Sequence, residues 1–254
     1  MSESNKRNFI VHGSILAIAG ILVRIIGMLY RIPVVNIIGS EGNGIYGAAF
    51  NIYNIMLVLS SYGLPMAVSK LVSARFTKKR YKSAAKVLRC SLMVAVCTGG
   101  IAALLVFFGA SFIENVIYGG GLPGLAIPLR ILAPTIFLVA ILGVIRGFFQ
   151  GQSTMIPTAV SQILEQIVNA IVSIAAGYGM MKAFASLPDV AAYGAAGSTL
   201  GTAMGALTAV LFMGFLYAVY TPTFNRLKRK DRHTENQSTG QICKIIIYTM
   251  IPII

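Results

Sequence analysis

Long apolar runs, separated by short polar or basic stretches, make up most of this chain. Six of these runs are about as long as a membrane-spanning helix, which needs about twenty apolar residues: 9–30, 45–71, 87–112, 126–149, 157–181 and 194–220. A seventh run begins at 245 and reaches the last residue, 254. The runs are continuous rather than alternating, which argues against a β-barrel. The pattern predicts an all-α, polytopic transmembrane helix bundle.

The fifth run carries the densest polar pattern within the apolar part of the chain. Its polar residues are spaced by three, one, three and four positions and share one helix face: Gln162, Glu165, Gln166, Asn169 and Ser173. A carboxylate and amides that faced lipid would be costly. We therefore expect this face to line a wet cavity or the bundle interior. Glu165 is expected either to form a structural ion pair or hydrogen bond, or to bind a coupling cation or proton.

Two arginines belong to the first run. Arg24 lies well inside it, and Arg31 follows seven residues later, about two turns on, so both point the same way. Arg31 suits the outer membrane interface, but Arg24 is about 10 Å deeper. We expect Arg24 to face a polar cavity. In the second run, Asn51, Asn54 and Tyr62 fall near one face and are further candidates for lining that cavity.

Charge predicts the orientation of the chain in the membrane. Only 11% of the residues are charged, against about 25% in a soluble domain. The net charge of +14 is concentrated in a few loops between apolar runs, which argues against nucleic acid as a partner. With six crossings and the N-terminus inside, 17 of the 21 lysines and arginines lie in inner segments, as the positive-inside rule favours. We therefore expect a multi-pass membrane protein with a cytoplasmic N-terminus.

The runs divide the chain into three parts. Residues 1–225 form a six-helix transmembrane lobe, 226–244 a basic cytoplasmic loop, and 245–254 the start of a seventh helix. Because ten residues cannot span a bilayer that needs about twenty, we expect the chain to be a piece of a longer protein. In the sixth run, small residues recur every three or four positions and predict a close helix contact: Gly194, Gly197, Gly201 and Gly205.

No catalytic or metal-binding pattern is present in the sequence. There is no phosphate loop and no nucleophile elbow, and Cys90, Cys97 and Cys243 lack metal-ligand spacing. We therefore expect no enzymatic activity, no metal and no cofactor, although a coupling Na⁺ or H⁺ stays open. Arginines in a membrane cavity suit phosphate, which guanidinium binds through two parallel hydrogen bonds, and amides suit sugar hydroxyls.

Two segments resemble a known family. They are RIIGMLYRIPVVNIIGSEGNGIYGAAFNIYNIMLVLSSYGLPMAVSKLVS at 24–73 and RGFFQGQSTMIPTAVSQILEQIV at 146–168. Both are similar to the polysaccharide-biosynthesis and stage V sporulation protein B family. That family belongs to the multidrug/oligosaccharidyl-lipid/polysaccharide (MOP) exporter superfamily, near the MurJ-type lipid II flippases. The resemblance implies two helical lobes around a central cavity, with this chain as the first lobe plus the start of helix seven.

The resemblance also implies a function. Members are thought to move undecaprenyl-linked oligosaccharides across the bacterial cytoplasmic membrane by alternating access. Arg24 matches a cavity arginine expected to meet the pyrophosphate, with Arg31 assisting. The other implied cavity residues are Asn51, Asn54, Gln162, Glu165 and Asn169. The implied partners are the lipid-linked sugar, membrane lipids and a second lobe of the same full-length chain.

Two other functions remain open at this point. One is a multidrug or metabolite antiporter of the same superfamily, coupled to a cation through Glu165. The other is a non-transporting scaffold that recruits cell-wall or spore-coat enzymes through its basic loops. Deletion of residues 226–232 separates the two classes, since a scaffold should fail while a transporter tolerates the loss.

Overall fold

A computed structural model describes residues 3–232 and 238–250, with side chains from residue 13 onward. The elements follow in the order α1 (Glu3–Ser61), α2 (Leu64–Thr77), α3 (Tyr81–Phe112), the π-helical turn η1 (Ile113–Ile117), α4 (Ala126–Gln150), α5 (Ile156–Ala183), α6 (Val190–Lys230) and α7 (Thr239–Met250). No strand occurs within these ranges. The all-α fold predicted from the apolar runs is confirmed.

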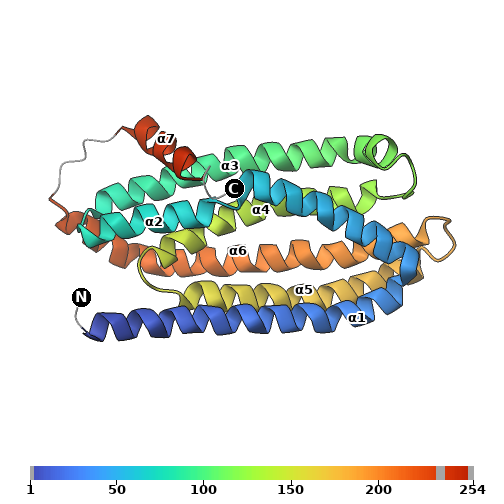
Figure 1. The fold of residues 1–254 in the computed structure, drawn as a ribbon, viewed down its shortest axis with the longest axis horizontal. Coiled ribbons are helices and arrows are strands. Elements are labelled where there is room, and N and C mark those ends of the chain that lie inside the picture. The colour runs from blue at the N-terminus through green and yellow to red at the C-terminus, as the bar shows by residue number, and fades with distance from the viewer. Residues whose placement is uncertain (1–2, 233–237, 251–254) are drawn as a thin grey trace.

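The long helices lie side by side along the long axis of the bundle (Figure 1). In the described ranges, five helical stretches are long and apolar enough to cross a membrane: 13–77, 81–117, 126–150, 156–183 and 190–230. Helix α1 bends at Gly39 into a first limb, 3–38, and a second limb, 40–61. The first limb lies along α5, and the second limb turns back over α4 (Figure 1).

The bend in α1 depends on a glycine. Gly39 has φ 70° and ψ −176°, a conformation almost confined to residues without a Cβ atom. The predicted runs 9–30 and 45–71 leave a break between them, but the chain is helical on both sides of this one residue. Ile38, Ile45 and Tyr46 are buried around the bend. Keeping the helix on both sides of Gly39 satisfies the backbone hydrogen bonds of this segment, which a loop would leave open.

Several helix ends also differ from the predicted ranges. The second run is divided at 62–63, and Pro65 falls in the first turn of α2, where its missing N–H costs no hydrogen bond. α3 begins at Tyr81 rather than 87, α6 continues to Lys230 rather than 220, and α7 begins at Thr239 rather than 245. Lysine and arginine are good helix formers, so helices continue beyond the apolar runs. Residues 233–237 of the predicted loop, and 251–254, lie outside the described residues.

The two basic stretches of the sequence meet at one end of the bundle, which we call the basic end. It comprises the α2–α3 turn and the C-terminus of α6, at the left of Figure 1. Buried Asp231 joins them, because its carboxylate accepts a hydrogen bond of 2.8 Å from the backbone N–H of Lys82 in the first turn of α3. A carboxylate at this position also complements the partial positive charge of the helix N-terminus.

The opposite end is fastened by a second carboxylate. Glu114 of η1 accepts hydrogen bonds from the backbone N–H groups of Gly124 at 3.1 Å and Ala126 at 2.7 Å. Ala126 is the first residue of α4, and the N–H groups in the first turn of a helix have no partner within that helix. The segment between the predicted runs 87–112 and 126–149 is therefore ordered and caps α4.

Glycine allows α2 to lie directly on α4. A Cβ atom at Gly147 would lie 2.5 Å from the carbonyl oxygen of Pro65. Next to this contact, the fully buried ring of Phe148 packs edge-on against Phe76 and Phe224. This aromatic cluster joins α2, α4 and α6 near the basic end.

The close contact predicted from the glycines of the sixth run is confirmed. Cβ atoms at Gly197, Gly201 and Gly205 of α6 would each overlap with atoms of α5, including the carbonyl oxygens of Ala176 and Glu165. α5 and α6 form the most extensive helix pair among the described residues. Van der Waals packing of this kind is a main source of helix association in lipid.

The glycine contact generates a prediction with a matched control on the same helix. Gly197→Ala should destabilise the folded protein by about 1–3 kcal/mol, because the new methyl group meets the α5 backbone, which cannot yield as a side chain would. Gly214→Ala adds the same atom where nothing lies within 4 Å, and should be neutral or slightly stabilising. Thermal unfolding of the two variants in detergent makes the comparison. Equal stability would contradict the close α5–α6 contact.

Candidate functional site

A polar recess lies between the second limb of α1, the start of α2, α4 and α5. Its volume is about 230 Å³. Its polar lining consists of Ser61, Tyr62, Arg146, Gln150, Thr158 and Gln162. These residues come from the end of α1, the turn between α1 and α2, the end of α4 and the start of α5, and all but Arg146 are uncharged. The recess therefore offers hydroxyl and amide groups around one guanidinium.

An ion pair extends from this lining. Arg146 of α4 donates a hydrogen bond of 2.7 Å from Nη2 to Oε2 of Glu165 on α5. Its Nε–H donates to the hydroxyl of Ser161 at 2.9 Å, and that hydroxyl donates to the carbonyl oxygen of Thr158 at 2.8 Å. The side chains of Arg146 and Glu165 are 14% and 26% exposed. Glu165, the only acidic residue of the fifth run, thus forms an ion pair, which is one of the two roles expected for it.

Asn169 occupies a different environment. It is 8% exposed, and its Oδ1 accepts hydrogen bonds from the hydroxyls of Ser173 at 2.9 Å and Thr202 at 3.4 Å. Its Nδ2 donates to the hydroxyl of Tyr30 at 3.3 Å. Asn169 therefore joins α5 to α6 and to the first limb of α1. The polar face of α5 is divided between the recess, which receives Gln162 and the ion pair, and this helix junction.

Contacts between α5 and the first limb of α1 give the depth of Arg24. Gly27 lies against Gln166, and Tyr30 bonds to Asn169. The residue numbers of the contacting pairs increase together along both segments, so the first limb of α1 and α5 run parallel. The same register places Arg24 level with residue 163 of α5. That is the level of the recess and of the Arg146–Glu165 pair.

Arg24 itself is exposed on the surface of the lobe. The neighbouring exposed side chains on the limb are large and apolar, among them Ile21 and Met28, which are 58% and 66% exposed. Asn51 and Asn54 are exposed on the second limb, beside the exposed Ile55. These three polar residues therefore lie on open surfaces of α1 and not inside the lobe.

Arg31 lies nearer the bend of α1. Its guanidinium is 5.9 Å from the centre of the Tyr46 ring, an arrangement that favours a cation–π interaction. With Asn36 and Asn43 it lines a shallow cavity of about 430 Å³ that is separate from the polar recess. The seven residues expected in one site thus fall into an α1 surface, a polar recess with its ion pair, and a helix junction.

The sequence did not point to four lining residues of the recess: Arg146, Ser61, Gln150 and Thr158. One signal for Arg146 was present, since a lone carboxylate within an apolar run calls for a basic partner nearby. The hydroxyl and amide residues of adjacent helix ends carry no such signal. In the described residues, no group of three or more His, Cys, Asp or Glu side chains could hold a metal ion.

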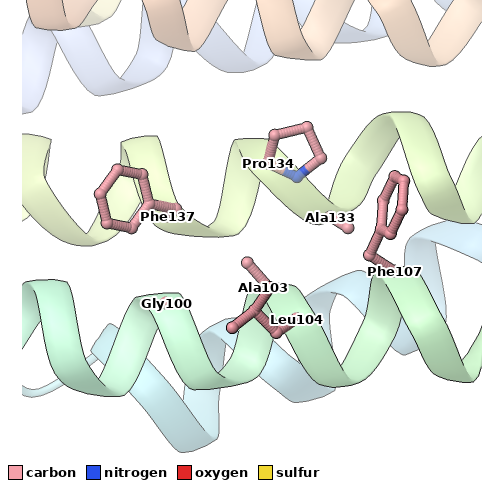
Figure 2. A pocket seen from close by; sticks show the side chains of 7 residues that line it. All are labelled: Gly100, Ala103, Leu104, Phe107, Ala133, Pro134 and Phe137. Atoms are coloured by element: carbon pink, nitrogen blue, oxygen red, sulfur yellow. The ribbon is translucent and has the colours of Figure 1, made fainter.

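A third cavity lies between α3 and α4, and its lining is apolar. Its volume is about 390 Å³, and Figure 2 shows the side chains around it, including Phe107, Pro134 and Phe137. All seven lining residues are apolar or glycine. Leu104 and Pro134 are exposed there, as expected for a surface that contacts lipid tails.

Comparison with known proteins identifies the family. The sequence model described as "Polysaccharide biosynthesis protein" matches residues 10–241, which is most of the chain. The chain belongs to this polysaccharide biosynthesis protein family. The resemblance noted in the sequence is confirmed.

Two curated relatives come from Bacillus subtilis (strain 168). The chain is 34% identical to lipid II flippase MurJ over 176 residues, which is 67% of this chain and 32% of that protein. It is 31% identical to stage V sporulation protein B over 209 residues, 82% of this chain and 39% of that protein. The matches therefore span less than half the length of these relatives. Neither relative is named as an enzyme, in line with the expectation from the sequence.

Solved structures show the same fold. An inward-facing multidrug resistance MATE family transporter of the MOP superfamily aligns with a TM-score of 0.68 and 16% identity, over 88% of this chain and 48% of the transporter. At this identity the likeness concerns the fold alone. Together with the apolar helices, the relatives show that this member of the family is a multi-pass membrane protein.

The hydrogen bonds of Asn169 generate a prediction about stability. Asn169→Ala should destabilise the protein by about 1–3 kcal/mol, because Tyr30, Ser173 and Thr202 lose a buried partner. Asn51→Ala, at an exposed position of α1, should change stability by no more than about 0.5 kcal/mol. Thermal unfolding in detergent measures both. If Asn169→Ala is as stable as Asn51→Ala, the helix junction does not depend on this side chain.

Proposed function

We propose that this chain is the first lobe of a flippase that moves an undecaprenyl-linked oligosaccharide, such as lipid II or a polysaccharide precursor, across the membrane by alternating access. The observation that carries the proposal is the position of Arg24, a charged side chain on an exposed apolar helix face, level with the polar recess. The 34% identity to a protein named lipid II flippase supports the same substrate class.

The chemistry of the residues suits a lipid-linked sugar phosphate. An arginine in the membrane is costly unless it meets a partner, and guanidinium matches a phosphate through two parallel hydrogen bonds. The uncharged hydroxyl and amide groups of the recess suit sugar hydroxyls. The long apolar tail would stay in lipid while the head group crosses. We assign Arg24 to the pyrophosphate, Arg31 to an assisting role, and Asn51, Asn54 and Gln162 to the sugar path.

The exposed face of α1 suggests the place of a second lobe. Large apolar side chains are exposed on both limbs of α1, including Met28, Leu29, Ile32 and Leu59. The solved MOP transporter is about twice as long as the part that this chain matches. We propose that a second helical lobe faces α1 and closes a cavity over Arg24, Asn51 and Asn54.

Arg24 provides the direct test of the proposed function. In liposomes that contain the full-length protein and a fluorescent undecaprenyl-pyrophosphate sugar, Arg24→Ala should lower the rate of leaflet transfer at least about 100-fold, since two charge-assisted hydrogen bonds are lost. Arg130→Ala, which removes an exposed arginine of α4 that bonds to Ser111, should retain transfer.

Either of two results would contradict this proposal. Normal transfer by Arg24→Ala at equal insertion would remove Arg24 from the mechanism. Absence of transfer by the parent protein, together with cation-driven efflux of a dye, would favour the antiporter.

We further propose a cytoplasmic N-terminus in the bacterial plasma membrane, with the basic end inside. The basis is the concentration of lysine and arginine at that end. In a variant without Cys90, Cys97 and Cys243, a cysteine at Lys78 should resist a membrane-impermeant maleimide in intact cells. A cysteine at Asn115, in η1 at the opposite end, should react. The reverse labelling pattern would invert the proposed orientation.

A further inference from the structure

We propose that Arg146 is a second phosphate-binding residue for the lipid-linked substrate, and that Glu165 is an internal competitor that holds Arg146 while the site is empty. The inference rests on the proposed flippase function and adds a residue and an exchange step to it. Its starting point is the way the two side chains meet at the polar recess.

The ion pair uses only part of the guanidinium. Glu165 accepts from Nη2, and Ser161 accepts from Nε. Within the part of the chain that the structure describes, Nη1 of Arg146 has no hydrogen-bond partner. Glu165 therefore holds Arg146 through one oxygen, and the fork formed by Nη1 and Nη2 is not fully occupied.

A phosphate would use this fork better than Glu165 does. Two parallel hydrogen bonds to Nη1 and Nη2 match the spacing of phosphate oxygens, and charge-assisted bonds of this kind are the strongest in proteins. The bond from Nε to Ser161 can persist during the exchange and keep the guanidinium in place. A carboxylate that makes a single bond can thus yield to a ligand that makes two.

The surroundings of the pair allow such an exchange. Both side chains are partly exposed, and Arg146 lines the recess directly. Attraction within a partly buried ion pair is largely offset by the cost of removing both charges from water, so the pair is weak as a structural fastener. Tyr53 of α1 also lies close enough to the Glu165 carboxylate to interact with it electrostatically, and this side chain supplies no second positive charge. A released Glu165 can turn toward the water of the recess.

Arg24 and Arg146 fit one ligand by their depth. The register of α1 against α5 places Arg24 level with residue 163, and Arg146 bonds to residues 161 and 165 of the same helix. Both arginines therefore lie at one height along the bundle, one on the open face of α1 and one in the recess. A pyrophosphate has two anionic groups, and we assign one of them to each arginine.

The test measures equilibrium binding of fluorescent undecaprenyl pyrophosphate to the full-length protein in detergent. Arg146→Gln should weaken binding about 10-fold or more with Arg24 intact, because a bidentate charged contact is lost. Glu165→Gln should tighten binding about 5-fold, because the competitor loses its charge. A pair that served only to fasten α4 to α5 would not tighten binding when broken. Arg130→Gln, on the same helix, is the matched control and should bind as the parent does.

Arg146→Lys separates a loss of contact from a loss of structure. Lysine keeps the charge opposite Glu165 but lacks the planar fork, so its affinity should fall between those of the parent and Arg146→Gln. Unchanged affinity in Glu165→Gln, or parent-like affinity in Arg146→Gln, would overturn the inference. The proposed flippase function would still stand if the parent protein binds and transfers the lipid. A parent protein that neither binds nor transfers the lipid would overturn both.

Discussion

The close contact between α5 and the glycines of α6 is the constraint on which the rest of the lobe depends. In lipid, helices gain little from burying apolar surface against one another, so they associate where backbones can approach and polar groups can bond. The glycines bring the two helices near enough for the Ser173 hydroxyl, whose single proton is shared with Oδ1 of Asn169, to donate to the carbonyl oxygen of Ser198 at 2.8 Å. This contact fixes the rotation of α5 about its axis, and therefore which polar side chains face α6 and which face the recess.

The fixed rotation divides one polar face into two parts with different roles. Asn169 and Ser173 are turned into the junction with α6 and α1, where each has a partner. Gln162 and Glu165, nearer the start of α5, are turned toward α4 and the recess. The buried part stabilises the lobe, and the partly exposed part is available for a ligand. Rigid support beneath a small set of adaptable polar groups is what a transport site requires.

The fold and the side chains carry different information about function. The likeness to a MATE transporter at 16% identity shows the fold alone, and one fold can serve different functions. What favours a phosphate-bearing cargo is the pair of arginines at one depth, with uncharged hydroxyl and amide groups between the helices. Helix α1 exposes a large apolar surface, and the chain matches 32% of one relative and 48% of a solved transporter. Both observations agree with the proposal that a second lobe packs on α1.

The sequence by itself determined the all-α fold, because runs of about twenty apolar residues in a bilayer must form helices to satisfy their backbone. It also predicted the contact face of α6, since small residues at helical spacing favour close packing, and the need of Glu165 for a partner. The tertiary structure alone decided that Arg146 is that partner, that Asn169 belongs to a helix junction, and that Gly39 bends one continuous helix. Periodicity places residues on the face of one helix, but the rotation and register of neighbouring helices, set by packing between distant segments, decide what that face meets.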